Sequence, residues 1–329
     1  MLKNIYLIIM LMMTTPIAAQ KDTIGKIEVF DARMHSIVEQ DAIIEVLTDD
    51  MQWAEGPVWV EQQRCLLFSD PKQNTIFKWT AAEGTTAFLK PSGYTGLGAY
   101  SDEPGSNGLL INLEGDLVAC EHGDRRISQM NLTKGGKVTL ADRWDNKRFN
   151  SPNDICQHRD GTYYFTDPPY GLPEREADTQ HRETPIHGVY RLNTSNTVEQ
   201  IINNLARPNG IALSADEKLL YVAQSFAAEP YIMAYPLQEG DLSQSGSILF
   251  NFKTQFPQQE AYPDGIKVDA AGNIFAGAAD GIVVIGADGV LLGRIYIGTK
   301  TANCAFSDDG YLYITASNYV LRVKLKSLG

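Results

Sequence analysis

Five acidic or amide side chains recur along the chain at a nearly constant offset from short β-rich phrases. Each of them lies nine or ten residues before the phrase that follows it; they are Glu55, Asn107, Asn153, Asn209 and Asp264. Together they offer carboxylate and amide oxygens, with no His or Cys, which suits Ca²⁺ better than a softer metal. A single Asn or Asp commonly caps a turn instead. Five at matched offsets favour one shared cation site, where Mg²⁺, Mn²⁺ or Zn²⁺ are conceivable substitutes for Ca²⁺.

The β-rich phrases themselves form a repeat. Six of them follow one another at a spacing of about fifty residues: CLLFSD (65–70), DLVACE (116–121), TYYFTD (162–167), LLYVAQ (219–224), NIFAGA (273–278) and YLYITA (311–316). A short strand pattern precedes and follows each phrase, with turn residues between them. Repeats of this length are typical of propellers. We therefore predict an all-β fold, a six-bladed β-propeller with about four antiparallel strands per blade, formed as one domain by residues 20–329. A two-domain β-sandwich would not explain six copies of one phrase.

This fold explains why the five side chains should meet. Equivalent positions on the innermost strand of every blade line the central channel of a propeller. The five residues are therefore expected to converge at one end of that channel. In the sixth repeat, TKTANCAFSDDG, Ala302 stands at the corresponding position. A divalent cation would offset the cost of placing two carboxylates close together in a partly buried site.

Charge and the N-terminal segment limit the partners and the compartment. The formal net charge of −12 argues against nucleic acid and anionic membranes as partners. Residues 1–19 combine Lys3, an apolar run over residues 5–13 and small residues at Ala18 and Ala19, the layout of a secretory signal peptide. We expect a periplasmic or secreted protein without membrane contact after cleavage. The alternative is an uncleaved anchor, for which the apolar run is short.

The four cysteines are expected to be buried free thiols. Cys65, Cys120, Cys156 and Cys304 each lie inside an apolar strand pattern, and none has the C-x-x-C spacing of a zinc site. A disulfide is the alternative, because export would permit one.

Trp53, Trp59 and Trp79 are expected to pack between blades. The polar insertion at residues 173–187 is interpreted as a solvated loop or a lid over the channel mouth.

Several phrases resemble a known family. WAEGPVW (53–59), SPND (151–154), RPNGIALS (207–214) and YPDGIKVD (262–269) are similar to those of the senescence-marker-protein/gluconolactonase family. Members of this family are six-bladed, calcium-dependent propellers that hydrolyse sugar lactones. EHGDRRI (121–127) and FTDPPYGL (165–172) resemble its bacterial gluconolactonase branch, and the resemblance spans most of residues 50–325.

The resemblance implies roles for individual residues. It implies that Glu55, Asn153, Asn209 and Asp264 bind the metal and that Asn107 contacts the substrate. Glu121 and His122 follow a strand of the second repeat and are expected at the pocket rim. Arg125 is a further candidate for holding a polar substrate, although pairing with a local acid is an alternative.

The chemistry open to this set is metal-assisted ester hydrolysis. A Ca²⁺ ion can polarise a lactone carbonyl, while Asp264 orients or deprotonates the attacking water. Direct attack by Asp264 is a covalent variant. His122 is a candidate for proton transfer because an imidazole titrates near neutral pH. A serine-hydrolase mechanism has no support, since no G-x-S-x-G elbow occurs.

Three functions follow from these observations. The first is an exported calcium-dependent lactonase that hydrolyses an aldono-lactone such as glucono-1,5-lactone. The second is a hydrolase of phosphoesters or other lactones that resembles diisopropyl fluorophosphatase. The third is a non-enzymatic binding propeller with a structural Ca²⁺ ion. Fold alone does not separate them.

Overall fold

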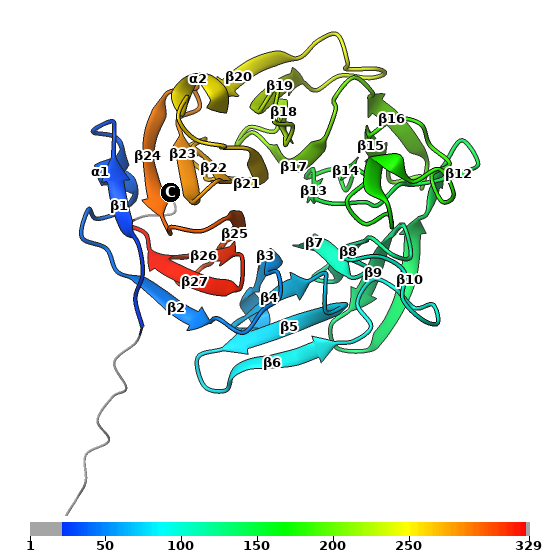
Figure 1. Cartoon of the computed structure of the whole chain (residues 1–329), viewed down its shortest axis with the longest axis horizontal. Coiled ribbons are helices and arrows are strands. Elements are labelled where there is room, and N and C mark those ends of the chain that lie inside the picture. Colours follow the sequence, from blue (N-terminus) through cyan, green and yellow to red (C-terminus); the bar gives the residue numbers. More distant parts are fainter. Residues whose placement is uncertain (1–21, 327–329) are drawn as a thin grey trace, which may run out of the picture.

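Six antiparallel sheets surround a common axis in the computed structural model, which describes residues 22–326 (Figure 1). The prediction of an all-β, six-bladed propeller is confirmed. The proposed signal peptide, residues 1–19, lies outside the described residues. Neither of the four-residue α-helices in the described part has the length to cross a membrane.

The first three blades follow one another along the chain, each as a four-stranded meander. Blade 1 contains β3 (Glu55–Val60), β4 (Cys65–Asp70), β5 (Thr75–Thr80) and β6 (Gly84–Leu89). Blade 2 contains β7 (Ser106–Ile111), β8 (Leu117–Glu121), β9 (Arg126–Asn131) and β10 (Gly135–Ala141). Blade 3 contains β13 (Ile155–Gln157), β14 (Tyr163–Asp167), β15 (Gly188–Leu192) and β16 (Val198–Ile202).

The last three blades continue the ring. Blade 4 contains β17 (Pro208–Leu213), β18 (Leu219–Gln224), β19 (Tyr231–Pro236) and β20 (Ser247–Asn251). Blade 5 contains β21 (Pro263–Val268), β22 (Ile274–Ala278), β23 (Gly281–Ile285), β24 (Leu291–Tyr296) and an added outer strand, β1 (Lys26–Val29). Blade 6 contains β25 (Thr301–Phe306), β26 (Tyr311–Ala316), β27 (Tyr319–Lys324) and β2 (Ile44–Thr48).

Short elements connect the blades. The small hairpin β11 (Arg143–Trp144) and β12 (Lys147–Arg148) lies between blades 2 and 3. The helices are single turns, namely α1 (Met34–Ile37), α2 (Phe252–Gln255) and the 3-10 turns η1 (Glu61–Gln63) and η2 (Arg175–Ala177).

The N-terminal strand β2 closes the ring. The sixth repeat supplies only three strands from the C-terminal end of the chain, and β2 pairs antiparallel with β27 as the fourth (Figure 1). Ile44 faces Val323 in this pairing, and both side chains are buried. Glu45 and Arg322 join the same two strands by an ion pair of 2.9 Å. The two ends of the described chain are therefore held in one sheet.

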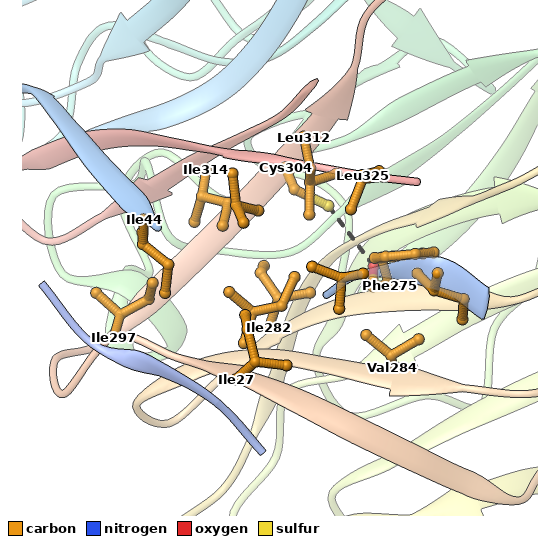
Figure 2. Close-up of a cluster of buried hydrophobic side chains, with 14 of the residues drawn as sticks. Ile27, Ile44, Phe275, Ile282, Val284, Ile297, Cys304, Leu312, Ile314 and Leu325 are labelled. Atoms are coloured by element: carbon orange, nitrogen blue, oxygen red, sulfur yellow. Dashed lines mark hydrogen bonds between the residues drawn. The ribbon is translucent and has the colours of Figure 1, made fainter. Parts of the chain in front are cut away.

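The core lies in the apolar layers between neighbouring blades. Figure 2 shows the layer between blades 5 and 6, in which Phe275, Ile282 and Val284 face Cys304, Leu312 and Ile314. Ile27 and Ile44 from the N-terminal strands complete this cluster. Such burial contributes about 25 cal/mol for each Å² of apolar surface removed from water.

Three of the cysteines and two of the tryptophans take the predicted packing roles, whereas Cys156 is only partly buried. All four cysteines are free thiols, and Cys65, Cys120 and Cys304 are buried. Trp59 stacks on Tyr313 at 5.2 Å between ring centroids, and Trp79 packs on the same tyrosine at 5.9 Å. These contacts join blade 1 to blade 6. Trp53 differs from the prediction, because it lines a cavity at the channel mouth.

Glycines let the innermost strands approach one another closely. Gly56 and Gly210 directly follow Glu55 and Asn209. A Cβ atom on Gly56 would lie 1.9 Å from the Asn107 carbonyl oxygen, and one on Gly210 would lie 2.3 Å from the Asp264 carbonyl oxygen. Each glycine therefore brings the candidate residue of its own blade against that of the next blade.

Replacing Gly210 by alanine should destabilise the protein. The added methyl group would meet backbone atoms of β21, which cannot move aside as a flexible side chain could. We expect Gly210→Ala to lower the free energy of unfolding by about 2 kcal/mol or more, measured by urea denaturation. The control is Gly240→Ala, where φ is +82° but nothing lies within 4 Å of the new Cβ. Its cost should be only that of backbone strain, roughly 1 kcal/mol. Equal losses in both variants would contradict the close-approach interpretation.

Candidate functional site

The five residues predicted to converge do so at one end of the central channel. Together they line a cavity of about 300 Å³: Glu55, Asn107, Asn153, Asn209 and Asp264. Glu55, Asn107, Asn153 and Asn209 are nearly buried, with exposed fractions of 4% to 6%, whereas Asp264 is partly exposed. One side chain from each of blades 1 to 5 therefore faces the same small volume.

Irregular pairing of the innermost strands aims these side chains at the cavity. Strand pairing shifts register between Glu55 and Val58 in β3, and the same irregularity occurs at the equivalent places in β7, β17 and β21. Bulges of this kind redirect a side chain away from regular alternation and are common beside active sites. In these four strands the register shift therefore occurs next to the polar residue that faces the cavity.

Asn153 reaches the cavity from a segment just before β13. Its backbone N–H donates to the Thr166 carbonyl at 2.9 Å. The carboxylate of Asp167 accepts backbone N–H bonds from Asn150 at 2.7 Å and from Ser151 at 2.8 Å. This buried carboxylate holds the SPND segment, and with it Asn153, against blade 3.

The two carboxylates of the cavity are electrostatically unfavourable by themselves. Burial and the negative charge of Asp264 raise the pKa of Glu55 well above its usual range. Burial also raises the pKa of Asp264 to about 7, although a hydrogen bond from Asn209 lowers it. Glu55 is held by the Trp53 indole N–H at 3.3 Å and by the Gly56 N–H at 3.1 Å. Neither Glu55 nor Asp264 forms an ion pair with a cation of residues 22–326.

The donor set fits a hard divalent cation. A dication would relieve the repulsion between the two carboxylates. The Asn107 and Asn153 side chains are nearly buried and make no hydrogen bond to another residue of the described part, so their oxygens are available. No group of three or more His, Cys, Asp or Glu residues in that part is arranged to hold a metal. Amide oxygens are accordingly needed to complete any coordination shell here.

A further acid next to a cavity residue is fully buried. Asp154 follows Asn153, and burial raises the pKa of its carboxyl. The Lys267 ammonium lies 3.6 Å from this carboxylate and donates to the Asn303 side-chain oxygen at 3.2 Å. In blade 6, Ala302 is fully buried and brings no oxygen ligand, as the repeat predicted. The buried charge of Asp154 is therefore offset in part by Lys267.

The structure keeps Glu121 and Arg125 away from the cavity. Glu121 is fully buried in blade 2, where Arg126 and Lys137 form ion pairs of 2.6 Å with it and Ser128 donates a hydrogen bond. Arg125 donates to the Phe149 carbonyl at 2.6 Å and to the His181 carbonyl at 2.7 Å. Both side chains are occupied within the fold. We therefore withdraw them as substrate contacts.

His122 lies behind the cavity wall. Its Nδ1 donates to the Glu103 carbonyl at 3.1 Å, which leaves the lone pair on a buried Nε2 that has no hydrogen-bond partner in the described part. Its ring packs against the backbone of Gly171, next to Tyr170, which does line the cavity. The ring is not among the residues that line the cavity, and its role in proton transfer stays a prediction.

Nine lining residues were not predicted as site residues: Trp53, Lys72, Glu103, Tyr170, Arg175, Arg207, Ser225, Tyr262 and Lys300. Most come from loops and strand ends without a repeated offset. Tyr170 stands in the FTDPPYGL phrase, and Trp53 stands two residues before Glu55 in the WAEGPVW phrase. Both phrases carry the family resemblance, so these two residues could have been proposed from the sequence. Burial raises the pKa of Tyr170, whose hydroxyl interacts with the side chains of Ser225 and Asn209. The insertion at residues 173–187 brings Arg175 to the cavity wall.

Comparison with known proteins gives a consistent result. Residues 53–318 match the family model described as "SMP-30/Gluconolactonase/LRE-like region". The chain is 41% identical over 315 residues to a gluconolactonase of Zymomonas mobilis, covering 93% of this chain and 88% of that protein. A solved gluconolactonase structure from Xanthomonas campestris superposes with a TM-score of 0.79 at 28% identity, covering 94% and 99% of the two chains. Regucalcin from Pongo abelii is 25% identical over 278 residues, covering 83% and 85%.

His122 should make the stability depend on pH. Burial lowers its folded-state pKa to about 4, against a usual value of 6.5. Protons therefore bind this imidazole more readily in the unfolded chain, so His122 by itself destabilises the folded state as the pH falls from about 6.5 to about 4, by about 3 kcal/mol in total. The raised pKa values of Asp167 and Asp264 act in the opposite direction. We expect His122→Gln to remove this contribution, so its free energy of unfolding in urea should rise relative to that of the wild type as the pH falls over this range. The exposed-ring control His35→Gln should keep the wild-type slope, and an unchanged slope in His122→Gln would contradict the assignment.

Proposed function

The chain belongs to the SMP-30/gluconolactonase/LRE-like family, and we propose that it is a calcium-dependent sugar lactonase that hydrolyses an aldono-lactone such as glucono-1,5-lactone. Its similarity to a gluconolactonase over most of both chains supports a lactone hydrolase, which is a carboxylic-ester hydrolase. The reaction and the metal go beyond what this similarity states. They rest on the residues around the cavity.

One observation carries the proposal. Glu55, Asn153, Asn209 and Asp264, from four different blades, face the same cavity of about 300 Å³. A set of two acids and two amides suits Ca²⁺ better than a transition metal, because all the donors are hard oxygens. A purely structural ion would not need an adjoining cavity lined by polar and aromatic side chains. This combination favours a substrate site over a binding propeller with a buried ion.

The metal, when bound, supplies a Lewis acid that polarises the lactone carbonyl and lowers the barrier to attack. Asp264 is the proposed general base, because its carboxylate faces the cavity and can orient or deprotonate a water molecule. The water oxygen forms a bond to the carbonyl carbon, and the bond between that carbon and the ring oxygen breaks. The ring oxygen takes up a proton and becomes a hydroxyl group. Attack by Asp264 itself is the covalent alternative.

Other cavity residues bind and orient the sugar in this proposal. Asn107 can hydrogen-bond a sugar hydroxyl. Tyr170 retains its proton because burial raises the pKa of its hydroxyl, so it remains a hydrogen-bond donor. Trp53 and Tyr262 supply aromatic surface on the same cavity. Cavities with aromatic walls and a few directed polar groups are typical of small-molecule sites.

We also propose that the protein acts in the periplasm or outside the cell. The support is the signal-peptide pattern of residues 1–19 in the sequence. A fusion of this segment to a reporter enzyme that is active only after export would test the proposal.

Lactone hydrolysis should depend reversibly on the metal. We expect the mature chain to release acid from glucono-1,5-lactone well above the spontaneous rate in Ca²⁺, to lose this activity in EDTA, and to regain it when Ca²⁺ is restored. A pH-stat measures the acid directly. Absence of turnover in the metal-loaded protein would contradict the lactonase proposal. Turnover of a phosphoester in the same assay would then support the phosphoester-hydrolase alternative.

Asp264→Ala should remove both metal retention and turnover. The substitution deletes one of only two carboxylates at the proposed site, so we expect Ca²⁺ affinity to fall roughly a hundredfold and activity to fall to background. Calorimetric titration with Ca²⁺ gives the affinity independently of activity. Asp269→Asn is the matched control, because Asp269 directly follows the same strand, β21, and bonds locally to Asn273. Full Ca²⁺ binding by Asp264→Ala would refute the ligand assignment.

A further inference from the structure

The cavity has an excess of positive charge in a protein of strongly negative charge. The chain carries 40 acidic and 28 basic residues. The cavity nevertheless has four cationic side chains on its wall, namely Lys72, Arg175, Arg207 and Lys300, against the three acids Glu55, Glu103 and Asp264. The local charge balance is thus reversed where a substrate would enter.

Two of the four cations have acidic partners. Arg175 lies 3.4 Å from the Glu103 carboxylate, and Arg207 lies 2.5 Å from the Glu176 carboxylate. These pairs account for both guanidinium groups. Glu55 and Asp264 would balance the two charges of the proposed metal ion. Each acid of the cavity then has a positive partner: Arg175 for Glu103, and the proposed metal ion for Glu55 and Asp264. Neither lysine is needed for this balance.

Lys72 and Lys300 remain without a counter-charge. Neither forms an ion pair within 4 Å with a residue of the part that the structure describes. Lys72 lies in the turn after β4, with its ammonium 5.7 Å from the centre of the Trp53 ring, and its positive charge acts on Glu103 only from a greater distance. Lys300 directly precedes β25 on blade 6. Two exposed ammonium groups thus face the cavity from neighbouring blades.

The cavity extends past this wall. Trp53, Tyr262, Asp264 and Lys300 also line an adjoining cavity of about 500 Å³. Two further acids lie on its wall, Asp280, which pairs with Arg294 at 2.6 Å, and Glu260. A lactone whose carbonyl lies beside the oxygen donors would direct the other end of its carbon chain toward the walls. A negatively charged group at that end could approach the lysines without displacing any existing ion pair. A neutral sugar would leave both charges unmatched.

We propose that the preferred substrate is a sugar lactone that carries an anionic group, a carboxylate or a phosphate, at the end away from the ester, and that Lys72 and Lys300 bind this group. The inference rests on the proposed lactonase function and specifies its substrate class. A carboxylate would make the substrate the monolactone of a dicarboxylic sugar acid. A phosphate would make it a phosphorylated aldono-lactone. The two share the charge that the lysines recognise.

Matched pairs of lactones test the proposal in the calcium-loaded full mature chain. One pair is glucono-1,4-lactone with glucaro-1,4-lactone, which differ by a carboxylate. The other is glucono-1,5-lactone with 6-phosphoglucono-1,5-lactone, which differ by a phosphate. We expect kcat/KM to be roughly tenfold higher for the anionic member of at least one pair at low ionic strength. The pair that shows the preference identifies the group, and about 0.5 M salt should reduce it.

Charge variants connect the preference to the two lysines. The double variant Lys72→Gln and Lys300→Gln should bring the ratio of kcat/KM within each pair close to one, whereas Lys→Arg at both positions should retain it. Lys218→Gln is the control, because that side chain is 81% exposed and far along the chain in the β17–β18 turn. Calorimetry with glucarate, 6-phosphogluconate and gluconate supplies a readout without turnover. The double Gln variant should lose most of its preference for glucarate and 6-phosphogluconate over gluconate.

The outcomes separate this inference from the function on which it rests. Hydrolysis of neutral lactones with a ratio near one in both pairs overturns the inference alone. A preference that persists in the double Gln variant also overturns it, because another group would then bind the anion. Failure to hydrolyse any of these lactones with the metal bound overturns the lactonase proposal and this inference together.

Discussion

Two carboxylates placed side by side at the end of a channel set the main physical constraint on this protein. Glu55 and Asp264 come from blades 1 and 5, and burial is the main cause that raises both pKa values. The charge of Asp264 adds to the rise for Glu55, and the charges of Asp154 and Glu103 add to the rise for Asp264. No residue of the described chain forms an ion pair with either of them. Their cost must be met by the packing of the blades, unless a cation shares their oxygens. The surrounding amides and the adjoining cavity are understandable as features of a site built around that charge.

The ring of blades gives this constraint its mechanical support. Bulged innermost strands aim the side chains, and glycines such as Gly56 and Gly210 let those strands lie close enough for residues of different blades to share one volume. The ring must also resist opening, since a small rotation of one blade would separate the donors. Pairing of β2 with β27 and the apolar layer between blades 5 and 6 hold the two ends of the ring together.

The cationic residues of the cavity differ from its oxygen donors in origin and in charge. The oxygen donors come from repeated positions on innermost strands, whereas Lys72, Arg175 and Lys300 come from turns and an insertion that differ from blade to blade. A family can therefore keep one reacting centre while loops alter the substrate that reaches it. In this chain the loops place two ammonium groups without an ion-pair partner of the described residues, Lys72 and Lys300, on the wall of the cavity.

Periodicity alone allowed the blades and the five converging side chains to be predicted, because a repeated offset in the sequence becomes a repeated position around the propeller axis. The fourth strand of blade 6 was not predictable in this way, since β2 is separated from its partner β27 by most of the chain. The sequence did not show, for a related reason, that Glu121, Arg125 and His122 do not line the cavity. A position near the end of β8 does not tell which way a side chain points, and the ion pairs of Glu121 within its blade decide that direction. Lys72 and Lys300 follow no repeat, so their meeting at one cavity depends on how the turns fold over the ring. Local pattern thus determined the strands and the oxygen donors, while the charge of the cavity wall was decided only by long-range packing, which brings together loops that are unrelated in sequence.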